Sequence, residues 1–157
     1  MAVIIVLAAI GVIIIWAILV YNGLVGLKNQ VENSWRQIDV QLKRRYDLIP
    51  NLVNAVKGAM DFERDTLTKV IEARSKAIAA QGPHDKAAAE SVLSGALGGL
   101  FALFESYPDL KSNQNVLELQ EELVSTENRI GFSRHFYNDI VAQFKTRQAV
   151  VPSRIIA

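Results

Sequence analysis

The chain begins with MAVIIVLAAIGVIIIWAILVY, residues 1–21, in which every residue is apolar, aromatic or glycine. The first charged side chain is that of Lys28. As a helix, this stretch is about 31 Å long at about 1.5 Å per residue, which matches the hydrocarbon core of a bilayer. A helix also satisfies its own backbone hydrogen-bonding groups, as lipid requires. The sequence therefore predicts a transmembrane anchor over residues 1–22.

Two aromatic residues, Trp16 and Tyr21, lie toward one end of this stretch, where amphipathic rings favour the membrane interface. A cleaved secretory signal is the alternative interpretation. It predicts a basic N-terminal region, a shorter apolar core and a small-residue cleavage site. The stretch carries no basic residue, and NGLVGL at residues 22–27 offers no clear cleavage site. We therefore expect an uncleaved anchor.

The charged residues all lie beyond the anchor. The 17 Lys and Arg and 16 Asp and Glu side chains leave a formal net charge of +1. This balance argues against a nucleic-acid partner, because nucleic-acid-binding domains usually carry a basic excess. The chain contains no cysteine, which excludes disulfides, thiolate catalysis and cysteine-based metal sites. The roughly 130 remaining residues suffice for one domain with one core.

Past the anchor, apolar residues recur at the spacing of three and four that marks one face of a helix. The first stripe continues directly from the anchor and consists of Leu24, Leu27, Val31, Trp35, Ile38 and Leu42. In the last segment, a seven-residue count gives a mostly apolar seam of Val116, Leu119, Leu123, Thr126, Ile130, Ser133, Tyr137, Ile140 and Phe144. Such a seam is typical of a coiled-coil contact. No alternating strand pattern appears.

Prolines and glycines divide the predicted helices. Pro50 predicts a boundary, because the residue before a proline avoids the α region. The turn residues QGPHD at 81–85 and Pro108 predict two more. The expected helices cover residues 23–46, 48–80, 86–107 and 113–150. The sequence thus predicts an all-α fold, in which the transmembrane helix continues into an elongated antiparallel up-down helical bundle at residues 23–152, with a tail at 153–157.

The third predicted helix contains an uncharged run, SVLSGALGGLFALF at residues 91–104. The run is too short to span a bilayer, which needs about 20 residues. Each glycine costs about 1 kcal/mol of helix propensity relative to alanine, which close backbone approach to a neighbour usually offsets. We expect core packing, and the alternative is a surface for self-association or membrane contact. The self-association residues would be Gly95, Gly98, Gly99, Leu100 and Phe101.

Several polar residues lie within or beside apolar stripes. Carboxylate, guanidinium and amide groups inside a bundle must pair or form hydrogen bonds. One interpretation is a pocket for a ligand or partner. We favour the other, an interhelical network that fixes the register of the helices. The residues of this network would be Glu63, Arg74, Glu127, Asn128, Arg134, Tyr137 and Asn138.

The sequence contains no evident catalytic constellation. His84 lies in a Gly-Pro turn, and His135 has Asp139 one turn later, which is half of a metal site and is expected to be a surface ion pair. No HExxH, Walker or GxSxG motif occurs. We therefore predict a protein that is not an enzyme and that needs no cofactor or metal ion.

Lys43, Arg44 and Arg45 form a short basic run. In a continuous helix this run lies about 33 Å past the anchor, which is several Debye lengths at physiological salt. Contact with anionic headgroups would need a bend in the helix. A solvated face or a contact with a neighbouring subunit is the expected role.

Three long motifs resemble the LemA family. They are YNGLVGLKNQVENSWRQIDVQLKRRYDLIPNLV at residues 21–53, FERDTLTKVIEAR at 62–74, and LSGALGGLFALFESYPDLKSNQNVLELQEELVSTENRIGFSRHFYNDIV at 93–141. The resemblance covers essentially the whole chain in order. The positions that match are Arg45, Pro50, Asn51, Glu63, Arg74, Glu127, Asn128, Arg134, Tyr137 and Asn138. Family chains usually continue beyond the PSRIIA-like segment with a short tail containing Phe and Gly, whereas this sequence stops at Ala157.

The resemblance implies a single-pass membrane protein with a helical-bundle domain and no enzymatic activity. It also implies two possible roles, because some relatives are linked to membrane remodelling and others occur beside membrane proteases. We predict a scaffold that self-associates into a homo-oligomer and organises or remodels the lipid bilayer. The alternative is an adaptor for a membrane protease or an envelope-stress partner.

The orientation of the anchor follows from the charges beside it. Lys28 and Arg36 lie close to one end, against only the α-amino group at the other. Because cytoplasmic flanks carry an excess of Lys and Arg, this weakly favours a cytoplasmic bundle with the N-terminus outside the cell membrane.

Overall fold

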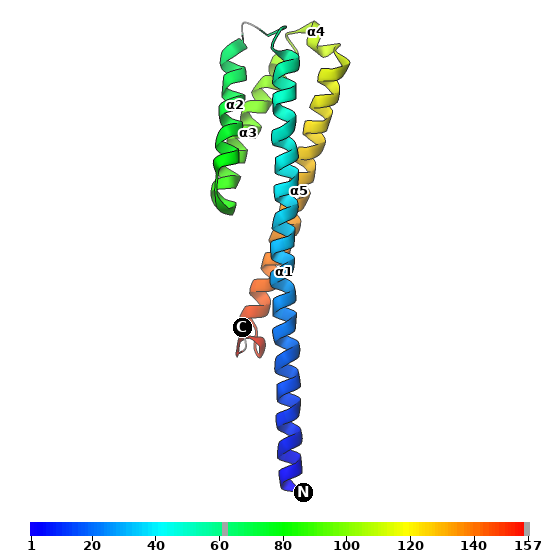
Figure 1. Cartoon of the computed structure of the whole chain (residues 1–157), viewed down its shortest axis with the longest axis vertical. Coiled ribbons are helices and arrows are strands. Elements are labelled where there is room, and N and C mark those ends of the chain that lie inside the picture. The colour runs from blue at the N-terminus through cyan, green and yellow to red at the C-terminus, as the bar shows by residue number, and fades with distance from the viewer. Residues whose placement is uncertain (61–62, 156–157) are drawn as a thin grey trace. The chain divides into compact units, whose positions relative to one another are not determined.

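The structure, a computed structural model, describes residues 1–60 and 63–155. All regular secondary structure in these residues is helical, which confirms the predicted all-α class (Figure 1). The α-helices are α1 (Ala2–Val56), α2 (Arg64–Ala79), α3 (Gly82–Phe104), α4 (Pro108–Lys111) and α5 (Gln114–Ala149), and a 3₁₀-helix, η2, covers Ser153–Ile155. The last two residues of the predicted tail, 156–157, lie outside the described residues.

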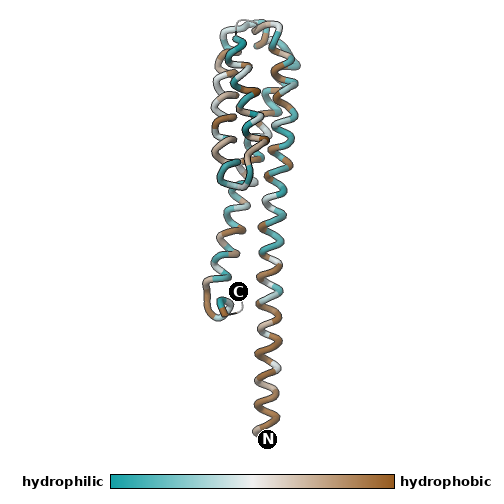
Figure 2. Tube along the Cα trace, turned by 60° about the vertical axis from the view of Figure 1, so that its left-hand side comes forward, coloured by the Kyte–Doolittle hydropathy of each residue, from teal (hydrophilic) through white to brown (hydrophobic). Residues whose placement is uncertain are grey.

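Helix α1 begins in the apolar stretch and continues without a break into the first amphipathic stripe, as expected. Figure 2 shows the change along the helix from a continuous apolar segment to mixed hydropathy. The predicted boundary before residue 48 is wrong, because Pro50 lies inside α1 and the helix ends only at Val56. The second predicted helix therefore loses its first part to α1, and α2 begins at Arg64.

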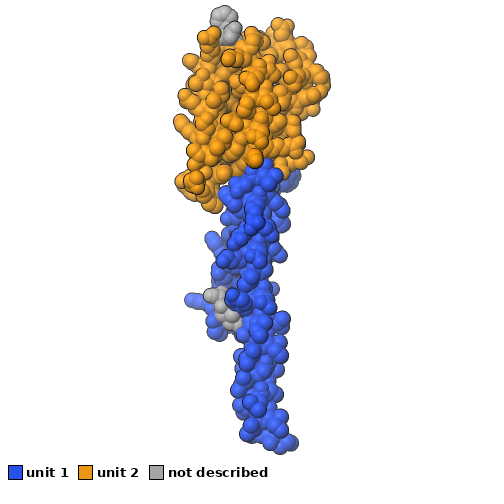
Figure 3. Space-filling view, viewed as in Figure 1, with its two compact units in different colours: residues 1–40, 130–157 blue, residues 41–129 orange. Residues whose placement is uncertain are grey.

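The chain divides into two compact units (Figure 3). Unit 1 contains residues 1–40 and 130–157, and unit 2 contains residues 41–129. Helices α1 and α5 contribute to both units, whereas α2, α3 and α4 belong to unit 2.

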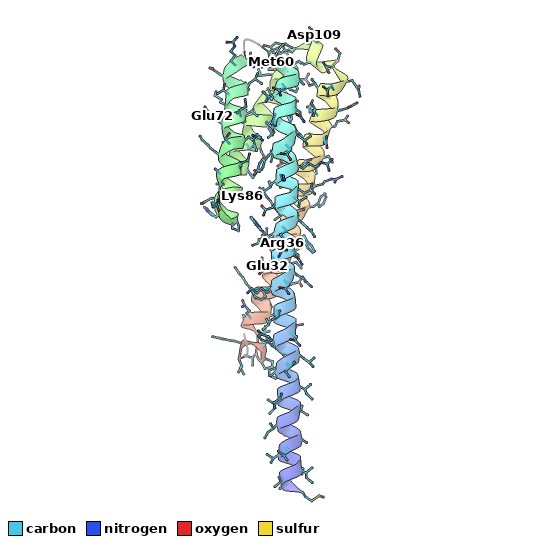
Figure 4. All side chains as sticks on the ribbon, viewed as in Figure 1. Glu32, Arg36, Met60, Glu72, Lys86 and Asp109 are labelled. Carbon is cyan, nitrogen blue, oxygen red and sulfur yellow. The ribbon has the colours of Figure 1, made fainter. Side chains whose placement is uncertain are left out.

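Unit 2 has a core of aliphatic side chains from all of its long helices. The fully buried residues include Leu42, Ile49, Leu52, Val56, Met60, Val70, Leu93, Leu100 and Val116. Met60, which Figure 4 labels, closes the turn after α1, and its backbone N–H donates to the Val56 carbonyl at 3.0 Å. Burying each such side chain contributes roughly 1.5–3 kcal/mol.

In unit 1, α5 packs antiparallel against α1. Ile38 and Ile130 are almost fully buried, and Ile140 is 7% exposed. The rings of Trp35 and Tyr137 meet edge to face, with centroids 5.3 Å apart. The predicted seam of α5 runs along its covered face, since each of its residues is buried or partly buried.

Helix α3 has two different faces. The face of Glu90, Leu93, Leu97, Leu100 and Phe104 is buried. Gly95, Gly98 and Gly99 are exposed, and a Cβ atom added to any of them would meet no other atom within 4 Å. The helix is therefore a core helix on one face only, and the glycines serve no close approach within the described part of the chain.

Candidate functional site

A buried ionic cluster lies in the centre of unit 2. Arg45 of α1 places its Nη1 atom 2.9 Å from Glu90 Oε2 of α3 and 2.5 Å from Glu127 Oε2 of α5. The side chains of Arg45 and Glu90 are 4% and 1% exposed, whereas Glu127 reaches the surface. One guanidinium thus joins two carboxylates from two other helices.

Two hydroxyl groups complete this cluster. Tyr46 Oη lies 2.5 Å from Glu90 Oε1, to which it donates, and 3.3 Å from the Ala77 carbonyl oxygen of α2. Ser94 Oγ accepts from Arg45 Nη2 at 2.9 Å and donates to Glu127 Oε1 at 3.3 Å. The cluster therefore connects α1, α2, α3 and α5, and sliding α1, α3 or α5 would leave a charge in the core unpaired.

Arg74 explains how α1 continues through Pro50. Proline has no backbone N–H, so the carbonyl of Tyr46, four residues earlier, lacks its intrahelical donor. Arg74 Nε of α2 donates to this carbonyl at 2.7 Å. A side chain from the neighbouring helix thus replaces the missing backbone hydrogen bond.

The seven residues of the predicted polar network do not form one network. Glu127 belongs to the ionic cluster, and Arg74 binds the Tyr46 carbonyl beside it. Glu63 accepts a hydrogen bond from Tyr107 Oη at 3.4 Å. The other four divide between the units: Asn128 is exposed in unit 2, and unit 1 holds Tyr137 against Trp35, a partly buried Arg134 and an exposed Asn138.

Sequence reasoning missed the centre of the cluster. Glu90 precedes the uncharged run and lies three residues before Leu93, so it continues the buried stripe of α3. Arg45 lies three residues after Leu42 and four before Ile49, on a buried face of α1. This helical spacing was the signal that could have identified both residues.

The basic run has a different role from the one expected. Arg45 is buried in the cluster, and Arg44 Nη2 pairs with Glu122 at 2.6 Å on the surface of unit 2. Of the three residues of this run, only Lys43 is exposed and has no ion pair with a described residue.

The predicted self-association residues differ in their exposure. Leu100 is fully buried and Phe101 is partly buried with its ring 5.8 Å from that of Phe104, so Leu100 cannot contribute to a contact surface. The three glycines remain accessible, along one exposed face with Val92, which is 61% exposed.

The described residues include no cluster of three or more His, Asp and Glu side chains that could hold a metal ion. His84 contacts only the exposed Asp85, at 3.3 Å. Partial burial and the nearby Glu63 carboxylate raise the pKa of Tyr107 above its usual value of 10.0. The neutral phenol donates a hydrogen bond to Glu63 Oε1 at 3.4 Å.

The apolar part of α1 is the most extensive exposed apolar surface in the described chain. Its large side chains are mostly more than half exposed, among them Ile4, Leu7, Val12, Ile15 and Leu19. Trp16 is partly buried and Tyr21 is 57% exposed. By length and composition, α1 and α3 could each cross a membrane, but the most apolar part of α3 is partly buried and that of α1 is not. α1 is thus the candidate membrane anchor.

Comparison with known proteins identifies one family. Residues 34–157 match the model of the LemA family. A curated relative, Protein LemA of Metamycoplasma hominis (strain ATCC 23114), is 29% identical over 129 residues, which is 80% of this chain. The chain covers 58% of the length of that relative.

Proposed function

The chain belongs to the LemA family, and from that premise we propose that it is a non-enzymatic scaffold anchored in the cell membrane by α1. The observation that carries this proposal is the uncovered apolar segment of α1, because soluble monomers rarely expose contiguous apolar surface beyond a few hundred Å². In a bilayer the same side chains face lipid. Trp16 and Tyr21 then lie toward the interface, as aromatic anchors do.

Extraction of membranes with alkaline carbonate tests the anchor. The full chain should stay in the membrane pellet, because a transmembrane helix resists extraction. Replacing Ile10 by Arg places a charge near the centre of the segment, at a cost of roughly 2.5–3.5 kcal/mol, and should release part of the protein. Val40→Arg is the matched control on the same helix, since Val40 is 63% exposed and lies beyond the apolar segment. Release of the unmodified chain would refute the anchor.

The scaffold also self-associates, through the glycine face of α3. Its exposed glycines cost helix propensity without packing against any described residue, which is understandable if another copy packs there. Cross-linking in intact membranes separates this role from the alternative one. Recurrent self-cross-links support the scaffold, whereas one recurrent foreign protein without self-cross-links would favour an adaptor for a membrane protease or envelope-stress partner.

The proposed orientation places the bundle in the cytoplasm. Lys28 and Arg36 flank the anchor on that side, as the positive-inside rule requires. In intact spheroplasts, external protease should leave the bundle uncut. The protease should cut the bundle only after the membrane is opened. Cleavage in intact spheroplasts would reverse the orientation.

A further inference from the structure

The last turn of α5 meets α1 just beyond the apolar segment. Within unit 1, Gly23 and Leu27 of α1 line an open groove of about 610 Å³ together with Thr146, Arg147 and Val150. The fold therefore brings the carboxyl end of α5 to the level of the residues that follow Tyr21 in α1. Sequence separation alone gives no indication of this proximity.

A serine holds the chain after α5 in a defined turn. Ser153 is buried, and its Oγ atom lies 2.6 Å from the Arg147 carbonyl oxygen and 2.9 Å from that of Val150. The backbone N–H of Arg154 also donates to the Val150 carbonyl, at 2.9 Å. The turn thus folds back onto the end of α5, so Arg154 lies beside the same end of α5 as Arg147.

Four exposed basic side chains of unit 1 lie in or directly after these segments of α1 and α5, and we call them the basic collar: Lys28, Lys145, Arg147 and Arg154. Within the described residues, none of them forms an ion pair with a carboxylate. Residues 21–31 and 140–157 contain no Asp or Glu. The next basic residue of α1, Arg36, differs because it pairs with Glu32 at 3.6 Å (Figure 4).

Large apolar side chains accompany these charges. Val151 and Ile155 flank Arg154 in the terminal turn and are 76% and 79% exposed. A surface that combines exposed apolar side chains with Lys and Arg is typical of segments that lie in the headgroup region of an anionic bilayer.

The collar lies at the depth where headgroups are found. Lys28 is about 10 Å past Tyr21 at about 1.5 Å per residue, which is about one Debye length at physiological salt. Lys145 and Arg147 lie in the last turns of α5, which line the groove beside Gly23 and Leu27, and the hydrogen bonds of Ser153 keep Arg154 next to them. At this distance the attraction to anionic lipid is partly screened, whereas it is almost completely screened at the run of residues 43–45, about 33 Å past the anchor.

We propose that the basic collar and the terminal turn form a docking surface for the anionic headgroups of the bilayer that α1 spans. This inference rests on the proposed function, because it requires α1 to be inserted. At the bilayer boundary, lipid phosphates can pair with the four cations while the apolar phase takes up the side chains of Val151 and Ile155. An acidic protein surface would supply negative charge for the cations but no apolar phase for Val151 and Ile155.

Lipid selectivity of the reconstituted full chain tests this proposal. The chain is inserted into vesicles of phosphatidylcholine and phosphatidylglycerol, and electron paramagnetic resonance measures how much spin-labelled lipid of each kind the protein immobilises. The collar variant carries Lys28→Gln, Lys145→Gln, Arg147→Gln and Arg154→Gln. The control removes the same charge from exposed lysines of unit 2, with Lys43→Gln, Lys57→Gln, Lys69→Gln and Lys76→Gln.

The unmodified chain should prefer phosphatidylglycerol, and added salt should weaken this preference. The collar variant should lose the preference roughly tenfold or more, the control should keep it, and Arg147→Gln with Arg154→Gln should fall between them. A preference that persists in the collar variant, or that falls equally in the control, would overturn the docking surface. Carbonate extraction measures membrane insertion independently of lipid preference. A chain that is inserted but shows no lipid preference would therefore contradict the docking surface without contradicting the proposed anchor.

Discussion

Arg45 and Glu90 are the residues whose pairing matters most for stability. Removing one partner of a buried ion pair leaves an uncompensated charge, at a cost of about 3–5 kcal/mol. Arg45→Met should therefore lower the free energy of unfolding by this amount, measured by thermal or urea unfolding in detergent. Arg44→Met is the control on the adjacent residue, and it should cost at most about 1 kcal/mol because the Arg44–Glu122 pair is half exposed.

A second substitution tests the physical reason for this loss. Arg45→Met combined with Glu90→Leu replaces the pair by apolar side chains, which often restores stability in other proteins. We expect the double variant to unfold at a higher temperature than Arg45→Met alone. If both unfold alike, the loss comes from packing and not from an unpaired carboxylate.

Arg74 and Pro50 should depend on one another. A charged donor to a buried carbonyl contributes about 1.5–3 kcal/mol, so Arg74→Met should cost this amount. In a Pro50→Ala background the new backbone N–H can reach the Tyr46 carbonyl, and Arg74→Met should then cost clearly less. A double-mutant cycle on the free energy of unfolding measures the difference. Equal costs in both backgrounds would mean that Arg74 does not replace the missing hydrogen bond.

The raised pKa of Tyr107 gives a pH dependence. Burial first, and then Glu63, favour the neutral phenol in the folded state, so the folded pKa lies above the unfolded value near 10. The stabilisation is complete below pH of about 10 and is lost as the pH rises through the folded pKa. In Glu63→Gln, the tyrosinate absorbance should appear at lower pH than in the unmodified chain. An unchanged titration would contradict the contact.

At the scale of helices, α3 provides the most direct prediction about association. Gly99→Leu adds a side chain to open space, so it should leave the monomer folded and even favour the helix, since leucine has higher helix propensity than glycine. It should nevertheless weaken self-association severalfold in sedimentation equilibrium. Gly131→Leu on α5 is the matched control, because a Cβ there also meets nothing within 4 Å. Equal effects of the two substitutions would exclude the α3 face.

The helices could largely be predicted from periodicity, but one boundary could not. By local rules Pro50 predicts the end of a helix. The helix continues because Arg74, which lies on another helix, donates to the Tyr46 carbonyl in place of the missing backbone N–H. The same limit applies to the site. Glu127 and Arg74 could be predicted because they lie within or beside apolar stripes. The helical spacing of Glu90 from Leu93 and of Arg45 from Leu42 gave the same signal, but only the fold shows that Arg45 pairs with both Glu90 and Glu127.

For the whole molecule, we propose a membrane-anchored chain that associates with itself. Membership of the LemA family specifies no assembly, and the chain covers only 58% of its curated relative. Two structural observations favour this proposal. The glycine face of α3 is uncovered, and the apolar segment of α1 is exposed.

Light scattering of the detergent-extracted full chain, with the detergent contribution subtracted, tests this claim most directly. At micromolar concentration the protein mass should be a multiple of 17.4 kDa, and it should fall toward that value in Gly99→Leu but not in Gly131→Leu. A mass of 17.4 kDa for the unmodified chain, unchanged on concentration, would show that the chain does not self-associate.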